Sequence, residues 1–414
     1  MARIIYLIKL CWLDFWAAIG LLQERFIKRT NDKIKVGFIC QYIPAWNKLL
    51  PVYNKLKSDS RFEVYLLCVP NRIEDGRLVS PESLENDTYE YYCQKGYEAV
   101  NTLIGKDTWL DLKEMKLDYI FYTRPYNSFM PAEYSSKAVS KYSKICVLLY
   151  AMTLAENEWN TALNRDFFRH VYLYFAEIAS GVKVNKKHYP VTHALGLRKS
   201  VYHGMPAIEQ FMEAKDEKTK VWDFSENEFR AMWTPRWTTD LSLGGTNFFL
   251  YKDALLDFAK EHGDISFLFR PHPLAFANFI KTGEMSEDEV AKYKQNISEL
   301  PNVCLDIEKE YVATMWNSSV LVSDFSGVIP EYFVTGKPII YCETNMILQP
   351  TEDFTKIISG CYCVKNEEEL FHWLMELKSG NDPLYEKRQL IIEELFGEKL
   401  NHASDMILHE LTSA

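Results

Sequence analysis

The 414-residue sequence lacks several short motifs that define large enzyme classes. It contains no GxxxxGK[ST] loop and no GxGxxG fingerprint, which argues against P-loop proteins and simple dinucleotide-binding proteins. It has no Asp-x-Asp triplet to hold a metal–nucleotide complex. Its nine cysteines include no CxxC pair, and Cys361-x-Cys363 alone is not a zinc site. We therefore expect no metal, no cofactor, and reduced cysteines that serve as small core residues.

Basic residues are not in excess. The 47 Lys and Arg are outnumbered by 57 Asp and Glu, which gives a formal net charge of −10. Because nucleic-acid binding requires a basic surface that neutralises phosphates, we expect no nucleic-acid partner. The chain is also too long for one growing hydrophobic core, so its length favours two domains.

The first thirty residues contain no uninterrupted apolar run, because Lys9 and Asp14 interrupt it, and no convincing cleavable signal. Apolar residues recur instead on one helical stripe, formed by Ile4, Ile8, Trp12, Phe15, Ile19, Leu22 and Phe26. The charged residues Arg3, Asp14, Arg25, Lys28 and Arg29 lie off the stripe. Residues 1–30 are therefore predicted to form an amphipathic helix. It either docks on the protein's own core or lies in a membrane surface with Trp12 and Trp16 near the headgroups; a true span is the third alternative.

From residue 31 the pattern is that of an α/β protein. Short apolar runs alternate with helical patterns such as Asp87–Ile104, which is typical of parallel, doubly wound sheets. The expected strands are Lys33–Cys40, Phe62–Val69, Leu117–Thr123, Lys144–Ala151, Phe229–Trp237, Ile265–Pro273, Asn302–Asp306, Ser319–Asp324 and Lys337–Glu343.

The charged stretch Glu213–Lys220 indicates a linker. We expect one Rossmann-like domain over residues 31–214, a second over residues 215–366, and C-terminal helices over residues 367–414 that pack back across the domains. Where two such domains face a central cleft, the carboxyl ends of their strands line that cleft. Ligands of doubly wound folds bind at those ends.

Two motifs follow expected strands of the second domain. In FLFRPHP, Pro271 and Pro273 stiffen a loop that presents Arg270 and His272, and a cation beside an imidazole suits a diphosphate. An ordinary strand-end turn with an incidental histidine is the alternative.

In SDFSGVIPEYFVTGKP, Asp324 ends a strand, and Ser326 and Gly327 open a helix whose amide groups can bind an anion. Glu331 lies one turn further, within reach of a ribose hydroxyl. The alternative is a normal helix cap. A third motif, MWTPRWTTD, ends in Arg236, which could reach a phosphate, and in Trp237, which could stack on a base or pack in the core.

At RPHP and SDFSGVIPEYFVTGKPIIYCE the sequence resembles the CDP-glycerol glycerophosphotransferase family of teichoic-acid and capsule polymerases, over roughly residues 115–345. WTPRW and VYHGMPAIEQF resemble two weaker motifs of that family. The resemblance implies a GT-B fold and a cytoplasmic enzyme, peripheral to the inner face of the cell membrane. Such an enzyme transfers glycerol or ribitol phosphate from a CDP-activated donor to a lipid-linked acceptor glycan. The first domain would then serve the acceptor and the second the donor nucleotide.

The resemblance implies that His272 and Arg270 contact the donor diphosphate, that the helix start at Ser326 holds phosphate, and that Glu331 faces the nucleotide. The family's Trp-His-Gly motif, which supplies the proposed acceptor base, is replaced here by LLYAMTLAENEW (Leu148–Trp159), and Gly327 replaces a family serine. Glu156, Glu158 or another carboxylate could act as base, with Glu156 as the first candidate. The alternatives are a GT-B glycosyltransferase with a nucleotide-sugar donor, which needs no such base if it retains configuration, and a non-catalytic GT-B subunit.

Overall fold

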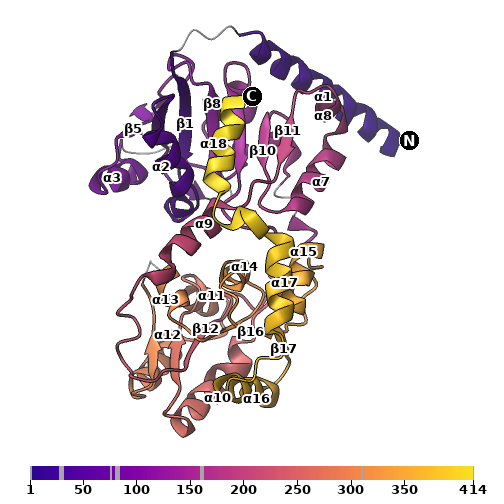
Figure 1. Cartoon of the computed structure of the whole chain (residues 1–414). Helices are drawn as coiled ribbons and strands as arrows, with labels where there is room; N and C mark the ends of the chain where they lie inside the picture. Colours follow the sequence, from indigo (N-terminus) through magenta and orange to yellow (C-terminus); the bar gives the residue numbers. More distant parts are fainter. Residues whose placement is uncertain are drawn as a thin grey trace. The chain divides into compact units, whose positions relative to one another are not determined.

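The computed structural model describes residues 2–27, 32–74, 77–79, 84–158, 163–308 and 311–413. Lys28, Arg29 and Trp159, which the sequence analysis names, lie outside these residues. The chain divides into two compact units (Figure 1). The first comprises Met1–Thr153, Glu158–Gln210 and His402–Ala414, and the second comprises Leu154–Asn157 and Phe211–Asn401.

The first unit contains a seven-stranded sheet whose neighbouring strands are all parallel, in the order β11-β10-β9-β8-β1-β2-β5. Its strands are β1 (Ile34–Cys40), β2 (Phe62–Cys68), β5 (Ala99–Asn101), β8 (Tyr119–Tyr122), β9 (Lys144–Leu148), β10 (Leu173–Phe175) and β11 (Lys199–Val201). The helices are α1 (Ala2–Arg25), α2 (Leu50–Ser58), α3 (Asp87–Gln94), α4 (Ser136–Val139), α6 (Arg165–Phe168), α7 (Ala179–His188), α8 (Pro190–Ala194) and α18 (Ala403–Ser413). Two small antiparallel pairs join β3 (Ile73–Glu74) to β4 (Arg77–Leu78) and β6 (Leu103–Gly105) to β7 (Thr108–Trp109).

The strand β1 lies at the centre of this sheet because its sequence is almost entirely apolar. Ile34 pairs with Phe62 of β2, and Val36 pairs with Tyr119 of β8. Gly37 is required here, since a Cβ at that position would lie 2.8 Å from a Leu67 methyl carbon. A strand buried on both faces reads as a continuous apolar run, which is why the sequence predicted it.

The helix predicted over Asp87–Ile104 is wrong beyond Gln94. The helix α3 ends there, Gly96 follows with a φ of 82°, and Ala99–Asn101 then form β5. A left-handed glycine terminates a helix readily, because its missing Cβ removes the steric penalty.

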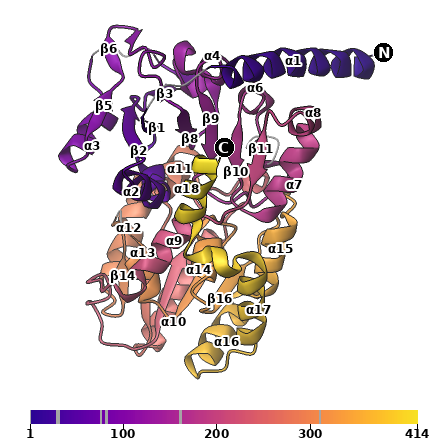
Figure 2. The same ribbon diagram turned by 45° about the horizontal axis from the view of Figure 1, so that its top comes forward.

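The helix α1 contacts the rest of the first unit through its C-terminal half. Ala18 and Leu21 pack with Leu197, and Asp14 forms an ion pair with Arg169 at 2.9 Å. Figure 2 shows the N-terminal end of α1 extending past the other elements of this unit. Among the described residues, no helix combines the length and the apolar character needed to cross a bilayer.

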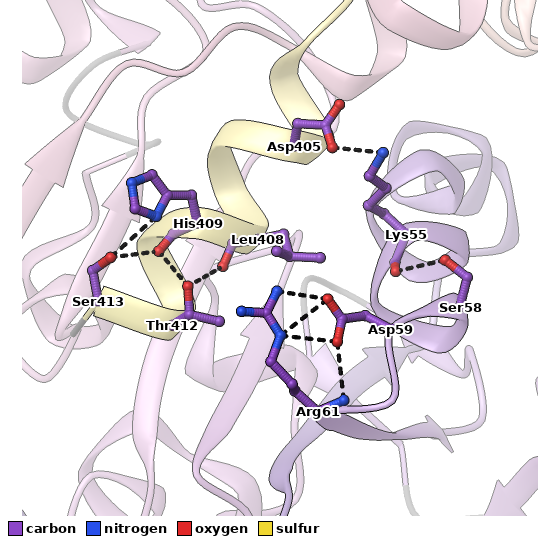
Figure 3. A network of polar contacts seen from close by, with 9 residues as sticks. All are labelled: Lys55, Ser58, Asp59, Arg61, Asp405, Leu408, His409, Thr412 and Ser413. Atoms are coloured by element: carbon purple, nitrogen blue, oxygen red, sulfur yellow. Dashed lines mark hydrogen bonds and ion pairs between the residues drawn. The ribbon is translucent and has the colours of Figure 1, made fainter.

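The C-terminal helix α18 packs on the sheet of the first unit. Ile407 and Leu411 are buried in its core, and the Tyr119 hydroxyl donates a hydrogen bond to the Leu411 carbonyl at 3.2 Å. Asp405 pairs with Lys55 of α2 at 2.5 Å (Figure 3). The chain therefore returns to its first unit after completing the second.

The second unit contains a six-stranded sheet with parallel neighbours, in the order β14-β13-β12-β15-β16-β17. Its strands are β12 (Arg230–Thr234), β13 (Ser266–Phe269), β14 (Val303–Leu305), β15 (Val320–Ser323), β16 (Ile339–Cys342) and β17 (Tyr362–Val364). The helices are α10 (Phe248–Glu261), α11 (Ala275–Lys281), α12 (Glu287–Ser298), α13 (Val312–Trp316), α14 (Val328–Phe333), α15 (Glu352–Ser359), α16 (Glu367–Lys378) and α17 (Tyr385–Leu395). The helix α9 (Pro206–Glu213) contains the division between the units.

Aromatic packing forms the core of the second unit. The rings of Trp233 and Phe269 on neighbouring strands lie 4.7 Å apart, and Phe248 of α10 stacks on Trp233 at 5.7 Å. The core thereby fixes the start of α10 against the carboxyl ends of β12 and β13. Both sheets have the doubly wound topology expected from the sequence.

A buried carboxylate anchors α18. Glu209 accepts hydrogen bonds from the Ser404 amide at 2.7 Å and from its hydroxyl at 2.6 Å, and both residues are buried. We predict that Glu209→Ala lowers the free energy of unfolding by about 2–3 kcal/mol, because two buried donors lose their partner at a helix N-terminus. Chemical denaturation measures this loss. The matched control Glu98→Ala, which removes an exposed ion pair with Lys57, should leave the transition unchanged.

Candidate functional site

The second unit has its topological switch point between β12 and β15. These strands are parallel neighbours, with Ala231 beside Val320. From β12 the chain proceeds to β13 on one side, and from β15 it proceeds to β16 on the other. The loops that follow β12 and β15 therefore diverge, and ligands of doubly wound sheets bind in the crevice this creates.

Asp324 lies at the bottom of this crevice and is fully buried. Its Oδ2 atom accepts hydrogen bonds from the Thr246 hydroxyl at 2.6 Å, the Arg236 amide at 3.0 Å and the Asn247 amide at 3.3 Å. Burial raises the pKa of Asp324 to about 6, although these hydrogen bonds oppose the shift. Asp324 thus fastens the loop after β12 to the loop before α10.

Arg236 lies directly above this carboxylate. Its Nη1 donates to the Phe325 carbonyl at 2.6 Å, and the guanidinium packs on the Phe325 ring at 5.1 Å. Gly244 makes this arrangement possible, since it has a φ of 103° and a Cβ there would lie 2.7 Å from Phe325. Arg236 is therefore held beside the turn that continues into Ser326.

The turn at Ser326 and Gly327 opens α14. The Ser326 hydroxyl accepts a hydrogen bond from the Val328 amide at 3.4 Å. Gly327 is exposed, and no atom lies within 4 Å of the position where its Cβ would be. The turn leaves space beside the backbone amides at the start of α14, and anion binding there stays a prediction.

His272 is presented by the loop after β13, and its side chain is exposed. Its Nδ1 accepts a hydrogen bond from the Leu274 amide at 3.2 Å, so the neutral ring carries its proton on Nε2. Desolvation by surrounding protein, and then the positive charge of Arg236, lower the pKa of His272. A neutral imidazole with a defined N–H donor is therefore held close to Arg236.

The side chain of Arg270 is bound by other groups of the protein. It forms an ion pair with buried Asp306 at 2.5 Å, and its Nη2 donates to the Glu308 carbonyl at 2.5 Å. Its guanidinium also lies 5.5 Å from the ring of Tyr311, whose hydroxyl donates to Glu331 at 2.5 Å. Arg270 and Glu331 are thus brought together through Tyr311.

The sequence analysis missed Asp306, Tyr311 and Thr246. The only available signal was that Asp306 ends an expected strand, at the same edge of the sheet as Arg270 and Asp324. A carboxylate in that position pairs naturally with the strand-end arginine beside it. Tyr311 and Thr246 gave no signal, because their roles depend on loops meeting in space.

Glu156 belongs to a short segment that clusters with the second unit. Its amide donates to the Gln349 carbonyl at 2.8 Å, and Ala155 bridges Pro350. Its side chain is exposed and, within the described part of the chain, contacts none of the other candidate residues. Glu158, by contrast, lies in the first unit.

Two doubly wound parallel sheets in one chain are the architecture of the GT-B class. Residues 167–411, more than half of the chain, match the family model described as CDP-Glycerol:Poly(glycerophosphate) glycerophosphotransferase, and the chain belongs to this family. The match extends further toward the C-terminus than the resemblance over residues 115–345. No curated protein sequence shows significant similarity to the chain.

Solved structures with this fold include two groups of proteins. UDP-GlcNAc 2-epimerase from Neisseria meningitidis has a TM-score of 0.61 at 14% identity, over 92% of this chain and 100% of that chain. The wall teichoic acid polymerase TagF has a TM-score of 0.53 at 13% identity, over 100% of this chain and 96% of that chain. The structural likeness establishes the fold, and the family match establishes the relationship.

Asp324 can be tested through the pH dependence of stability. Its pKa is about 6 in the folded protein against an ordinary value of 3.8, so the folded state binds more protons between these values. The wild type therefore loses stability as pH rises through this window, whereas Asp324→Asn does not titrate. We predict that, from about pH 4 to about pH 7, the wild type loses about 2.4 kcal/mol of unfolding free energy relative to the variant. Parallel curves for the two proteins in urea titrations would contradict this assignment.

Proposed function

We propose that the protein transfers a polyol phosphate, such as glycerol or ribitol phosphate, from a CDP-activated donor to a lipid-linked acceptor of a teichoic-acid-like or capsular polymer. The observation that carries this proposal is the position of Arg236, which is bonded to Asp324 and to Phe325 beside the Ser326 turn and also lies within electrostatic reach of His272. Arg236, His272 and the Ser326 turn are the groups required to bind a diphosphate without a metal. Membership of the family supports the choice of donor.

In the proposed reaction the acceptor hydroxyl attacks the phosphorus that carries the polyol. The bond between that phosphorus and the bridging oxygen of the diphosphate breaks, and CMP leaves. Negative charge develops on the bridging oxygen, where the Nε2–H of His272 donates a hydrogen bond and Arg236 balances charge. The hydroxyl proton passes to a carboxylate, for which Glu156 and Glu158 remain the candidates.

Asp324, Arg270 and Asp306 act as positioning residues in this proposal. Asp324 is too deeply buried to touch the donor, and Arg270 is held by Asp306. The Arg270 side chain orients Tyr311, which in turn orients Glu331. We propose that Glu331 accepts a hydrogen bond from a ribose hydroxyl.

His272→Ala tests the site directly. We predict at least a tenfold loss of turnover from CDP-glycerol to a lipid-linked acceptor, with an unchanged unfolding transition because the side chain is exposed. The matched control is His262→Ala, a half-buried histidine at the end of α10 that precedes β13 and so lies near the opposite edge of the same sheet. Unchanged turnover in His272→Ala would refute the role.

Stabilisation of the wild-type protein by different donors separates the alternative functions. Donor held at 100 times its dissociation constant should add about 2.7 kcal/mol to the stability of the wild type. Stabilisation by UDP-sugars but not by CDP-polyols would favour a glycosyltransferase. Binding of CDP-glycerol with neither hydrolysis nor transfer would favour a non-catalytic subunit.

We further propose that the protein is peripheral to the inner face of the cell membrane and binds it through α1. The side chains of Ile8, Trp12, Phe15 and Trp16 are all more than half exposed, and Lys9 lies among them. Exposed tryptophans favour the headgroup region, and an exposed lysine extends toward anionic phosphates. The apolar face of the N-terminal half of α1 therefore suits insertion into a lipid surface.

Replacement of Ile4, Ile8, Trp12 and Phe15 by Gln should weaken co-sedimentation with phosphatidylglycerol-containing vesicles at least tenfold, because each apolar side chain contributes about 1.5 kcal/mol or more on burial. Replacing the exposed residues Ile307 and Ile347 by Gln in the second unit is the matched control. Unchanged vesicle binding together with altered oligomeric state would show instead that this face contacts a second copy.

A further inference from the structure

Arg124 occupies the switch point of the first unit. In its sheet β1 and β8 are parallel neighbours, and the chain leaves them toward opposite sides. Arg124 lies two residues after the end of β8, and Tyr42 lies two residues after the end of β1. This is the position at which doubly wound sheets bind ligands, and neither the family motifs nor the donor site accounts for these residues.

The guanidinium of Arg124 is enclosed by aromatic rings. It lies 4.9 Å from the ring centroid of Tyr42 and 4.3 Å from that of Phe129. Its side-chain hydrogen bonds to described residues consist of one long contact, 3.5 Å to Asn71 Oδ1. Desolvation lowers the pKa of Arg124, which shows that the surrounding protein shields the charge from water.

No carboxylate of the described residues lies within ion-pair distance of Arg124. Arg169 pairs with Asp14, Arg270 with Asp306, and Arg388 with Asp382, whereas buried Arg198 donates instead to the carbonyls of Phe168 and Arg169. Arg124 has neither kind of partner among the described residues, apart from the long contact to Asn71. A partly desolvated guanidinium without a counter-ion is costly unless an anion binds it. The planar, multidentate guanidinium is especially suited to phosphate.

Tyrosine side chains surround the same guanidinium. Tyr42 and Tyr150 pack edge to face at 5.8 Å, and Tyr126 lies 4.9 Å from Phe129. Tyr42, Tyr126 and Tyr150 all interact electrostatically with Arg124. Within the described residues no group accepts a hydrogen bond from these hydroxyls, so each can donate to a phosphate or a polyol oxygen.

The walls of this cluster are fixed by hydrogen bonds from buried Gln41 and half-buried Asn127. The buried side chain of Gln41 donates to the Phe129 carbonyl at 2.6 Å. Asn127 donates to Asp166 at 2.7 Å and accepts from the Ser136 amide at 2.9 Å. The loop that carries Arg124 is therefore held in place before any ligand binds, which lowers the entropic cost of binding.

One acidic residue is close to the cluster. The charge of Glu158 contributes to the raised pKa values of Tyr126 and Tyr150, after the larger effect of burial. Glu158 forms no ion pair with Arg124, so it does not neutralise the guanidinium. Glu158 lies close to Tyr126 and Tyr150. A hydroxyl of the ligand would be tolerated beside this carboxylate, whereas a phosphate would be repelled.

We propose that Arg124, with Tyr42, Tyr126 and Tyr150, forms an anion site in the first unit that binds a phosphate group of the acceptor. Assignment of this ligand as the acceptor rests on the transferase function proposed above. Arg124 binds the phosphate, the tyrosine hydroxyls donate to its oxygens, and their rings pack on the carbon chain of the polyol.

The test uses a synthetic oligo(glycerol phosphate) as the anionic probe and maltotetraose as the neutral one. Arg124→Gln should raise the KM for the oligo(glycerol phosphate) at least tenfold and leave the KM for CDP-glycerol within twofold. Arg124→Lys should give an intermediate KM, because it keeps the charge but loses the planar fork. The matched control is Arg61→Gln, since Arg61 pairs with Asp59 at the amino edge of the same sheet (Figure 3).

Calorimetry with the probe alone separates this inference from the transferase function. If the wild type transfers nothing but binds the oligo(glycerol phosphate), and Arg124→Gln binds at least tenfold more weakly, the anion site stands and the proposed function fails. Equal probe binding by wild type and Arg124→Gln, absence of probe binding by the wild type, or equal binding of maltotetraose would overturn the site. Should Arg124→Gln fail to fold, Arg124→Lys and Tyr150→Phe give the same comparison, because both keep the packing of the cluster.

Discussion

The buried carboxylate of Asp324 is the constraint on which the site of the second unit depends. It is excluded from water, so its charge is tolerated only because Thr246 and the amides of Arg236 and Asn247 donate to it. Those donors all lie in the connection between β12 and α10, which is 77 to 88 residues away from Asp324 in the sequence. By binding both ends of this connection, the carboxylate draws the loop after β12 and the start of α10 to the end of β15, and Arg236 is thereby held beside the Ser326 turn.

The two units use arginine at comparable places in different ways. Arg270 follows a strand of the second sheet and is held by Asp306, so its charge is already balanced and its main effect is to order Tyr311 and Glu331. Arg124 follows a strand of the first sheet, and among the described residues its guanidinium contacts the rings of Tyr42 and Phe129 and the side chain of Asn71. A guanidinium with a buried partner stabilises a loop, whereas one without a partner is available to an anionic ligand.

The fold by itself does not select the chemistry. UDP-GlcNAc 2-epimerases and a teichoic acid polymerase both share it at low sequence identity, so the sheets serve as a common support for different reactions. What distinguishes this chain is the set of side chains that follow its strands. In the function proposed above, His272 with its proton on Nε2, Arg236 and the open turn at Gly327 bind the diphosphate leaving group.

The sequence alone was sufficient for the two doubly wound sheets, the family and the strand-end motifs, because strands such as β1 and β15 are buried on both faces and stand out as apolar runs. It was insufficient for β5, β10, β11 and β17, which have three residues each and are too short to show a period. Tertiary structure alone decided that Arg270 pairs with Asp306, that Tyr311 reaches Glu331, and that the Glu156 segment joins the second unit. Those outcomes depend on which loops meet at a sheet edge, and that is decided only when the strands pair. The partners are roughly 20 to 200 residues apart, and the local sequence around one residue carries no information about a partner at that separation.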